Sequence, residues 1–386
     1  MNVRLGIIGA GQLGLYLCQA ARKLGVSTCL LSETATAPAA TFTDRLVVGE
    51  LEDPVALEQF LEGSDVVTFD KEDIPEESLD CLLQAEADGR IRVHPGAEIL
   101  RLLKDKGTQK SWLEEQGFPT LPFKLLTGDD IDHTALVERF GLPLVQKARR
   151  GGYDGRGVQI LRDDAALDDL WPTPSLIEPF LGGSLEIAVL LARDVEGNCE
   201  AYPTLGMEFD PVLNSVTTVF TPSSIDPALA ESAIDLGKRV ISALGGVGVF
   251  ALEMWVTEAN ELFINEISPR VHNSGHLTME AASASQFEQH VRACVGLPLM
   301  DVSDTKPSAM VNILYESNLE QSCPGQPTCQ LDDDEQVAVH WYGKPPGQLG
   351  RKMGHVTAWA AQAGDATTRA QETRNDLPNR PATEAA

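Results

Sequence analysis

The sequence has no cysteine framework, no long apolar run and few basic residues, and each absence excludes a class of protein. Its seven cysteines form neither a CxxC pair nor a cluster with histidines, which excludes a disulfide scaffold and a zinc site of the usual spacing. No apolar stretch is long enough to cross a bilayer, and residues 1–11 lack the charged start and cleavage site of a signal peptide. We therefore expect a cytoplasmic protein with reduced thiols.

Basic residues are scarce, with 30 Lys and Arg against 57 Asp and Glu and a net charge of −27. A charge of this sign repels polyanions, so we expect no nucleic-acid partner and no membrane partner. An anionic small substrate would need a local basic pocket.

At 386 residues the chain exceeds what one ordinary core supports, and it suits two or three α/β units. Apolar strands alternate with helical patterns over residues 1–100, which predicts a parallel sheet. Residues 101–297 form a second unit with a glycine-hinged, β-rich lobe, and residues 298–360 form a small third unit. The remaining residues, 361–386, have few large apolar groups, and we expect them to be disordered.

The first candidate site is the glycine turn Gly9-Ala-Gly11-Gln-Leu-Gly14, between a strand and a helix. With Glu33 at the end of the next strand, it fits the dinucleotide fingerprint and suggests NAD. The same turn also serves other phosphate ligands, or tight packing alone, so all three interpretations stay open.

A second glycine-rich segment follows Lys147, in the run Arg149-Arg-Gly-Gly-Tyr-Asp-Gly-Arg-Gly157. Four glycines with flanking cations exceed what a hairpin turn needs, and they can lie over phosphates. Glu178 and Glu186 follow where an interdomain strand could reach an adenine or a ribose, although each alone is an ordinary exposed carboxylate.

The third candidate is the carboxylate pair Glu253 and Glu266 on two adjacent strand patterns. If residues 257–260 form the turn, Val256 pairs with Glu261, and the two glutamates become diagonal neighbours about 7 to 8 Å apart on one face. Magnesium fits such a site best, since it binds one or two carboxylates together with substrate phosphates.

Directly after this hairpin, Ser268-Pro-Arg-Val-His-Asn-Ser-Gly-His276 gathers a guanidinium, two imidazoles and an amide on one loop. Beside a metal and phosphate site, such a loop predicts a substrate clamp, with Arg270 neutralising a transferring phosphoryl group or its acceptor. For His276, a packing role is an equal alternative. A last basic group, Lys344, Arg351 and Lys352, contrasts with the acidic whole.

Five words in this order carry a family resemblance: Gly11-Gln-Leu-Gly14, Gly152-Tyr-Asp-Gly-Arg-Gly157, Pro269-Arg-Val-His-Asn-Ser-Gly-His276, Ser285-Gln-Phe-Glu288 and Gly350-Arg-Lys-Met-Gly-His355. Over residues 1 to about 357 the chain resembles the N5-carboxyaminoimidazole ribonucleotide synthases of the ATP-grasp superfamily. The resemblance implies an α/β ATP-grasp fold with an N-terminal Rossmann-like preATP-grasp domain, a mobile lid and a small C-terminal domain. It also implies a homodimer.

The resemblance assigns roles by position. Residues implied to bind ATP are Lys106, Lys147, Gly152, Tyr153, Asp154, Gly155, Arg156, Gly157, Val158, Glu178, Leu181, Glu186, Asn265 and Glu266. Residues implied to bind the ribonucleotide are Gln12, Leu13, Tyr153, Asp154, Arg270, His272, Asn273, Lys344, Arg351 and Lys352. Glu253 and Glu266 would hold Mg²⁺, and the implied catalytic residues are Lys147, Asp154 and Arg270.

The implied reaction is ATP- and bicarbonate-dependent carboxylation of aminoimidazole ribonucleotide through carboxyphosphate in purine synthesis, with possible coupling to the mutase that uses the product. A formate-dependent glycinamide ribonucleotide transformylase shares the fold, and a non-catalytic ATP-binding relative is a further alternative. The family pattern is altered at Leu15, at Asp70-Lys71, at Phe209 and at Tyr315.

Overall fold

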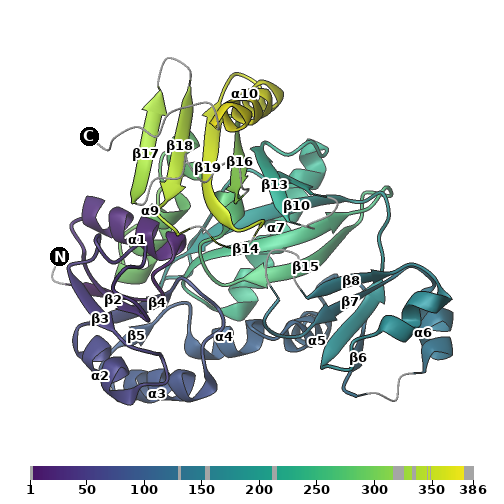
Figure 1. Cartoon of the computed structure of the whole chain (residues 1–386), viewed down its shortest axis with the longest axis horizontal. Helices are drawn as coiled ribbons and strands as arrows, with labels where there is room; N and C mark the ends of the chain where they lie inside the picture. The colour runs from purple at the N-terminus through teal and green to yellow at the C-terminus, as the bar shows by residue number, and fades with distance from the viewer. Residues whose placement is uncertain are drawn as a thin grey trace.

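The computed structural model describes residues 3–128, 132–152, 157–210, 215–315, 326–332, 336–345, 347 and 349–377. These residues form three β-sheets with helices packed on them (Figure 1). The α/β class predicted from the sequence is confirmed. Within the described residues, the search for a helix of membrane-spanning length and hydropathy found none.

The first sheet is parallel and contains the glycine turn. Its strand order is β3-β2-β1-β4-β5. The strands are β1 (Arg4–Ile8), β2 (Ser27–Ser32), β3 (Arg45–Val48), β4 (Val66–Phe69) and β5 (Arg92–Val93). Helices α2 (Pro54–Glu62) and α3 (Glu76–Ala87) cover one face, and α1 (Gln12–Lys23) covers the other. The apolar strands are buried on both faces, as expected for a parallel sheet between helices.

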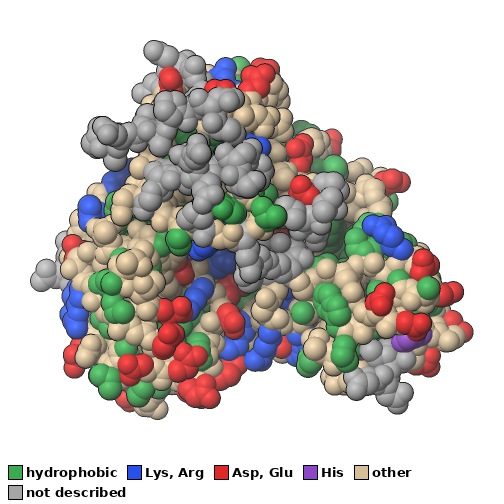
Figure 2. Space-filling model, in the orientation of Figure 1, with side chains coloured by type: hydrophobic (Ala, Val, Ile, Leu, Met, Phe, Trp, Pro, Cys, Tyr) green, Lys and Arg blue, Asp and Glu red, His purple; other side chains and the backbone are tan. Residues whose placement is uncertain are grey.

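A small lobe carries the second sheet, which is antiparallel in the order β6-β9-β7-β8. Its elements are β6 (Lys124–Leu126), α6 (His133–Phe140), β7 (Leu144–Ala148), β8 (Val158–Leu161), the 3₁₀ helix η1 (Asp164–Asp169) and β9 (Ser175–Pro179). Figure 1 shows this lobe set apart from the first sheet, with α4 (Ala97–Leu103) and α5 (Lys106–Glu115) between them. Figure 2 shows basic side chains gathered where the two units meet, in contrast to the acidic side chains spread over this face.

The third sheet is antiparallel and follows the order β15-β14-β10-β12-β13-β16-β19-β18-β17, with β11 paired to β10. Its strands are β10 (Leu185–Arg193), β11 (Cys199–Ala201), β12 (Leu205–Phe209), β13 (Val216–Thr221), β14 (Gly248–Val256), β15 (Leu262–Ser268), β16 (Ser308–Leu314), β17 (Pro327–Asp332), β18 (Val337–Tyr342) and β19 (Lys352–Trp359). Because β13 pairs with β16, the sheet runs without a break from the second predicted unit into the third.

Alternation along β10 separates two cores. Ile187, Val189 and Leu191 pack with α7 (Pro227–Leu244) on one face. Ala188 and Leu190 share a core with α1 and α9 (Gln286–Val295) on the other. The short elements η2 (Asn273–Gly275) and α8 (Thr278–Ala281) precede α9. The face toward α1 is therefore where the first sheet and the large sheet meet.

The expectation of disorder over residues 361–386 is wrong for the part that the structure describes. Residues Ala363–Asp376 form helix α10, which packs on β16 and β19. Ala366 and Ala370, four residues apart, are fully buried against the sheet, and Leu377 is 5% exposed. Alanine favours helix and lets the helix approach the sheet closely, so the segment needs few large apolar groups to be ordered. Residues 378–386 lie outside the described residues.

Candidate active site

The hairpin of β14 and β15 places the two predicted metal ligands directly opposite each other. Glu253 pairs with Glu266, and Val256 pairs with Leu262, not with Glu261. The predicted diagonal register is therefore wrong by one residue near the turn, and a bulge beside Glu253 leaves Asn265 as the extra residue. Because a bulge turns two consecutive side chains to one face, Asn265 and Glu266 both enter the site.

Two lysines meet this hairpin. The ammonium of Lys106 forms an ion pair with Glu266. Lys147 Nζ donates to Asn265 Oδ1 at 2.7 Å and lies 2.5 Å from Glu178 Oε1. The Asn265 amide also donates to Glu186 Oε1 at 3.4 Å. The structure thus brings together the lysines, carboxylates and amide that the sequence predicts for ATP and metal.

The glutamates Glu186, Glu253 and Glu266, termed here the carboxylate cluster, are short of positive charge. Burial and then the neighbouring Glu266 raise the pKa of Glu253 to about 7. Burial and then Glu253 raise the pKa of Glu186 well above its ordinary value. Burial alone would also raise the pKa of Glu266, but Lys106 holds it below that value. A cation placed here would stabilise the ionised form of all three.

The lid segment is only partly within the described residues. Tyr153, Asp154, Gly155 and Arg156, predicted for ATP, substrate and catalysis, lie outside them. The described residues on either side of this gap are Gly152 and Gly157, and Gly157 directly precedes β8, which starts at Val158. Gly157 has a φ of 74° and its carbonyl accepts from Ala148 N at 2.8 Å.

The predicted substrate clamp, residues 268–276, follows β15 into the same site. Arg270 Nε lies 3.0 Å from Glu72 Oε1, and His272 Nε2 lies 3.6 Å from Glu253 Oε1. Gln286 holds the loop, since its amide accepts from His272 N at 2.8 Å and donates to His272 O at 2.7 Å.

Asn273 forms a reciprocal amide pair with Asn312 of β16. The two Nδ2 to Oδ1 distances are 3.0 and 2.9 Å, and Asn312 also donates to Val216 O at 2.9 Å. This side chain anchors the loop to the C-terminal part of the large sheet, whatever it contacts in the substrate. The sequence assigned no role to either residue: Gln286 stands in a word that carries the family resemblance, Ser285-Gln-Phe-Glu288, and nothing in the local spacing marks Asn312.

His276 is fully buried and its ring Nδ1 lies 3.2 Å from Gln286 Nε2. Burial, followed by Lys352, holds the pKa of His276 well below its ordinary value, so this imidazole is neutral. It belongs to a buried group of rings with Tyr16, His355 and Tyr342.

The glycine turn is filled by the protein itself. Asp70 Oδ2 accepts from the backbone N–H of Gly11 at 2.7 Å and of Gly14 at 3.3 Å. At Gly9, whose φ is 101°, a Cβ would lie 1.8 Å from Asp70 Oδ1. The donors that a dinucleotide pyrophosphate would use are therefore occupied by a carboxylate.

The acidic residue of the fingerprint is occupied as well, because Glu33 Oε1 lies 2.8 Å from Lys71 Nζ. Asp70, which binds the glycine turn, and Lys71, which pairs with Glu33, are adjacent residues at a position where the sequence departs from the family pattern. The NAD interpretation has no support in this geometry.

Beside the glycine turn lies a cavity of about 350 Å³, and its opposite wall includes Lys344 and Arg351. Gln12 is the half-buried first residue of α1, whereas Leu13 is 6% exposed and packs in the core. Lys352 is 7% exposed, and its positive charge opposes the rise in the pKa of Glu253. The first sheet and the C-terminal strands thus close over the site together.

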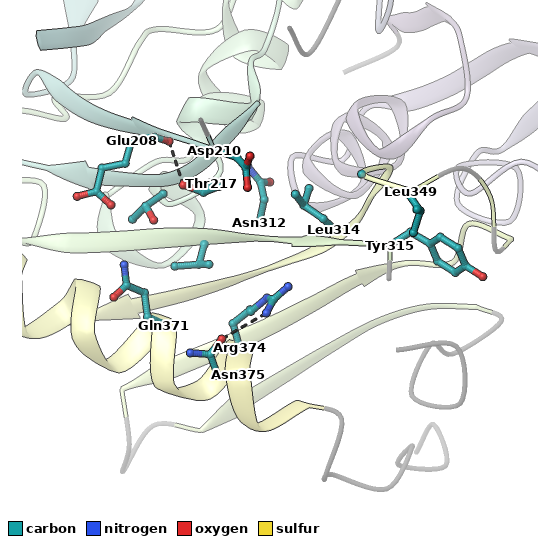
Figure 3. Close-up of a pocket in the computed structure, with 13 residues that line it drawn as sticks. Glu208, Asp210, Thr217, Asn312, Leu314, Tyr315, Leu349, Gln371, Arg374 and Asn375 are labelled. Atoms are coloured by element: carbon teal, nitrogen blue, oxygen red, sulfur yellow. Dashed lines mark hydrogen bonds between the residues drawn. The ribbon is translucent and has the colours of Figure 1, made fainter. Parts of the chain in front are cut away.

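A second cavity, of about 530 Å³, lies between β12, β13, β16 and α10 (Figure 3). Figure 3 shows Arg374 and Asn375 projecting from α10 toward the sheet. None of the predicted site residues lines it, but Asn312 does. Its lining residues are Glu208, Asp210, Thr217, Thr218, Val311, Asn312, Leu314, Tyr315, Leu349, Gly350, Gln371, Arg374 and Asn375.

Comparison with known families assigns all three parts of the chain. The ribonucleotide synthetase preATP-grasp domain matches residues 2–104, and the ATP-grasp domain matches residues 111–287. The phosphoribosylaminoimidazole carboxylase C-terminal domain matches residues 308–369, and its last nine residues fall within the segment expected to be disordered.

Relatives with the same architecture cover nearly the whole chain. The N5-carboxyaminoimidazole ribonucleotide synthase of Brucella melitensis is 34% identical over 362 residues, which are 92% of this chain and 95% of the relative. That of Bacillus subtilis is 30% identical over 362 residues, covering 92% and 90%.

Solved structures agree with these relatives. The crystal structure of N5-carboxyaminoimidazole ribonucleotide synthetase from Thermotoga maritima superposes with a TM-score of 0.83 at 33% identity, covering 97% of this chain and 98% of that chain. The Aspergillus clavatus synthase in complex with ADP and 5-aminoimidazole ribonucleotide gives a TM-score of 0.83 at 26% identity, covering 98% and 99%. This chain belongs to the N5-carboxyaminoimidazole ribonucleotide synthase family of ATP-grasp enzymes.

Proposed function

We propose that this chain carboxylates 5-aminoimidazole ribonucleotide, using ATP and bicarbonate, to give N5-carboxyaminoimidazole ribonucleotide in de novo purine synthesis. The observation that carries the proposal is the pair Glu253 and Glu266 on adjacent strands, with Lys106 and Lys147 beside it. In a chain of this family, that arrangement suits a metal–nucleotide complex whose terminal phosphate is transferred.

Mg²⁺ fits this site by its donor chemistry. Glu253 and Glu266 supply hard carboxylate oxygens, and Lys106 alone does not balance the cluster, as the raised pKa of Glu253 indicates. Magnesium takes one or two carboxylates and completes its octahedral shell with water and substrate phosphates. When bound, the ion would supply positive charge to the transferring phosphoryl group.

Lys106 and Lys147 would bind the ATP phosphates, because their ammonium groups contact two adjacent residues of β15, Glu266 and Asn265. Glu178 and Leu181, at the connection between β9 and β10, would border the adenine, and Glu186 the ribose. Lys147, already held by Asn265 and Glu178, needs little reorganisation to keep its charge near the phosphates.

The chemistry follows two steps. A bicarbonate oxygen attacks the γ-phosphorus of ATP, so that a new P–O bond forms, the bond to the bridging oxygen breaks, and ADP leaves. The exocyclic amine then takes the carboxyl group, either directly from carboxyphosphate or from CO2 that carboxyphosphate releases. In both routes inorganic phosphate leaves, a C–N bond forms, and the amine loses a proton. Arg270 would stabilise the acceptor, and Asp154 would orient the amine or receive its proton. Carboxyphosphate hydrolyses in water, so a lid over residues 152–158 would protect it.

The cavity between the glycine turn and Lys344 and Arg351 would receive the ribonucleotide. Since Asp70 already occupies the turn's N–H donors, the substrate phosphate would be neutralised by the two cations of the C-terminal part. The other residues proposed to contact the ribonucleotide are His272, Asn273, Lys352, Gln12 and Leu13, together with Tyr153 of the lid.

The family resemblance also supports a homodimer, a cytoplasmic location and functional coupling to the mutase that consumes the product, and we retain these with the three-unit division as proposals. The alternative of a non-catalytic ATP-binding relative is suggested by the altered family pattern at Phe209 and Asp70-Lys71. The assembly of Lys147, Glu253, Glu266 and Arg270 in one site favours catalysis.

The test is a substrate-omission assay on the purified chain with ATP and Mg²⁺. ADP formation that requires both bicarbonate and aminoimidazole ribonucleotide, with labelled carbon entering an acid-labile product, is the expected result. Formate and glycinamide ribonucleotide, offered in parallel, should give no ADP. ADP formation only with that second pair would favour the transformylase, and ATP binding without ADP formation under any condition would contradict an enzymatic function.

A further inference from the structure

A buried lysine that no predicted role includes lies directly behind the nucleotide site. Lys110 Nζ is 2.6 Å from Glu178 Oε2, and the two side chains are 3% and 2% exposed. The other carboxylate oxygen of Glu178 lies 2.5 Å from Lys147 Nζ. Glu178 is therefore held between two cations, one of them facing the site and the other behind it.

Helix α5 presents this lysine by its spacing. Lys106 and Lys110 are four residues apart and thus on one face, where the first pairs with Glu266 and the second with Glu178. The start of the helix is fixed by Asp105, which accepts from Gly107 N at 2.9 Å and pairs with Arg149 at 2.8 Å. One rigid face thus carries two cations to two carboxylates of the same site.

The burial of this pair is hard to explain by stability. Removing two charges from water costs about as much as their attraction returns, so apolar side chains of similar volume usually do as well. Lys110 lies in the second turn of α5, away from the C-terminal end at which a helix dipole stabilises a cation. A charge retained at such a place points to a function, and the shared partner Glu178 indicates which one.

We propose that Lys110 is a positioning residue for nucleotide binding: its ammonium fixes the carboxylate of Glu178, which in turn holds the ammonium of Lys147 beside Asn265. The inference rests on the proposed function of the site in binding ATP. Without Lys110, Glu178 Oε2 loses its ion-pair partner within the core, and Glu178 no longer has a single orientation from which to hold Lys147.

The experiment measures the dissociation constant of ADP with Mg²⁺ by calorimetry on the full chain, without bicarbonate or ribonucleotide. Lys110→Met keeps the length of the side chain and removes the charge, and we expect it to weaken ADP binding about tenfold. The matched control is Lys104→Met. Lys104 is equally buried, at 5% exposed, and pairs with Glu76 at 2.7 Å outside the nucleotide site, so its loss should leave the constant within about twofold.

A double-mutant cycle separates positioning from packing. If Lys110 acts through Glu178, Lys110→Met adds no further loss in a Glu178→Gln background. Losses that multiply in the double variant, or equal losses in Lys104→Met, would overturn the proposal. Lys110→Gln, also neutral, provides the same comparison if Lys110→Met does not fold. Failure of the wild type to bind ADP would instead contradict the proposed function itself.

Discussion

The glycine turn and the carboxylate cluster are both predicted as ligand sites from their sequence patterns, yet the structure balances their charges differently. At the turn, Asp70 fills the N–H groups of Gly11 and Gly14. In the cluster, burial and Glu266 raise the pKa of Glu253 to about 7, although Lys106 lies close by. A motif therefore determines backbone geometry, whereas the counter-charge supplied by the rest of the chain determines whether a ligand is needed.

The largest expected effect is at the cluster. Replacing Glu253 by Gln removes half of the carboxylate pair, and we expect kcat for ADP formation to fall about 100-fold or more, which is about 2.7 kcal/mol of transition-state stabilisation. Steady-state assays over a range of Mg²⁺ concentrations measure it. The control is Glu261→Gln, an exposed glutamate just before β15. If Glu253→Gln is as active as this control, the carboxylate cluster does not need a bound cation, and the proposed difference between it and the glycine turn is contradicted.

At the glycine turn, we expect the loss of Asp70 to lower the stability of the protein. Asp70→Ala leaves two N–H groups without their acceptor, and we expect the free energy of unfolding in urea to fall by about 2 kcal/mol. Inorganic phosphate should then stabilise the variant and not the wild type, because the vacated donors can bind an anion. Equal phosphate effects on both proteins would show that Asp70 does not close the turn.

Asn312 links the loop that follows β15 to the C-terminal strands, through its amide pair with Asn273. Asn312→Ala removes the amide pair with Asn273, and we expect KM for the ribonucleotide to rise about tenfold, as for the loss of one or two hydrogen bonds. KM for ATP, measured in the same assays, should stay within about twofold. A parallel rise in both constants would mean that the variant disturbs the whole site and not the loop alone.

The smallest effect concerns a buried ion pair beside the site. Burial opposes the charged form of His340, but Glu280, 2.7 Å away, raises its pKa to about 10. This pair therefore contributes stability that is complete below about pH 6.5 and is lost as the pH rises through 10. Cys329 and the stacked His355 also face the ring.

The measurement for this pair is the melting temperature of wild type and Glu280→Gln between pH 6 and pH 10. The difference should be about 1 °C at pH 6, which corresponds to about 1 kcal/mol in a chain of this length, and should shrink toward pH 10. A difference in melting temperature that grows with pH would contradict the assignment of a positive charge to His340.

Local patterns predict much of this architecture. The apolar strands that alternate with helices predict the parallel first sheet, because each strand and helix can be recognised from its own residues.

The bulge at Asn265 could not be predicted in this way, since it depends on partners that are distant in the sequence. Ile264 N donates to Pro119 O at 2.8 Å, and Ile267 N donates to Gln109 Oε1 at 2.8 Å, so β15 is held from its outer edge. Hairpin spacing alone cannot show this.

Long-range partners also explain the other differences. Asp70, Gln286 and Asn312 hold loops that lie elsewhere in the sequence, and no local pattern shows which groups their side chains bind. Helix α10 depends on the sheet that it covers, so its composition alone suggests disorder. The residues with chemistry were predictable by type, and the residues that hold them in place were not.

The measurement that tests this account most directly is ADP release from ATP and Mg²⁺ with bicarbonate, with and without aminoimidazole ribonucleotide, in wild type and Glu266→Gln. The account predicts release that depends on the ribonucleotide in the wild type and disappears in the variant. Equal release by both proteins would contradict the role assigned to the carboxylate cluster.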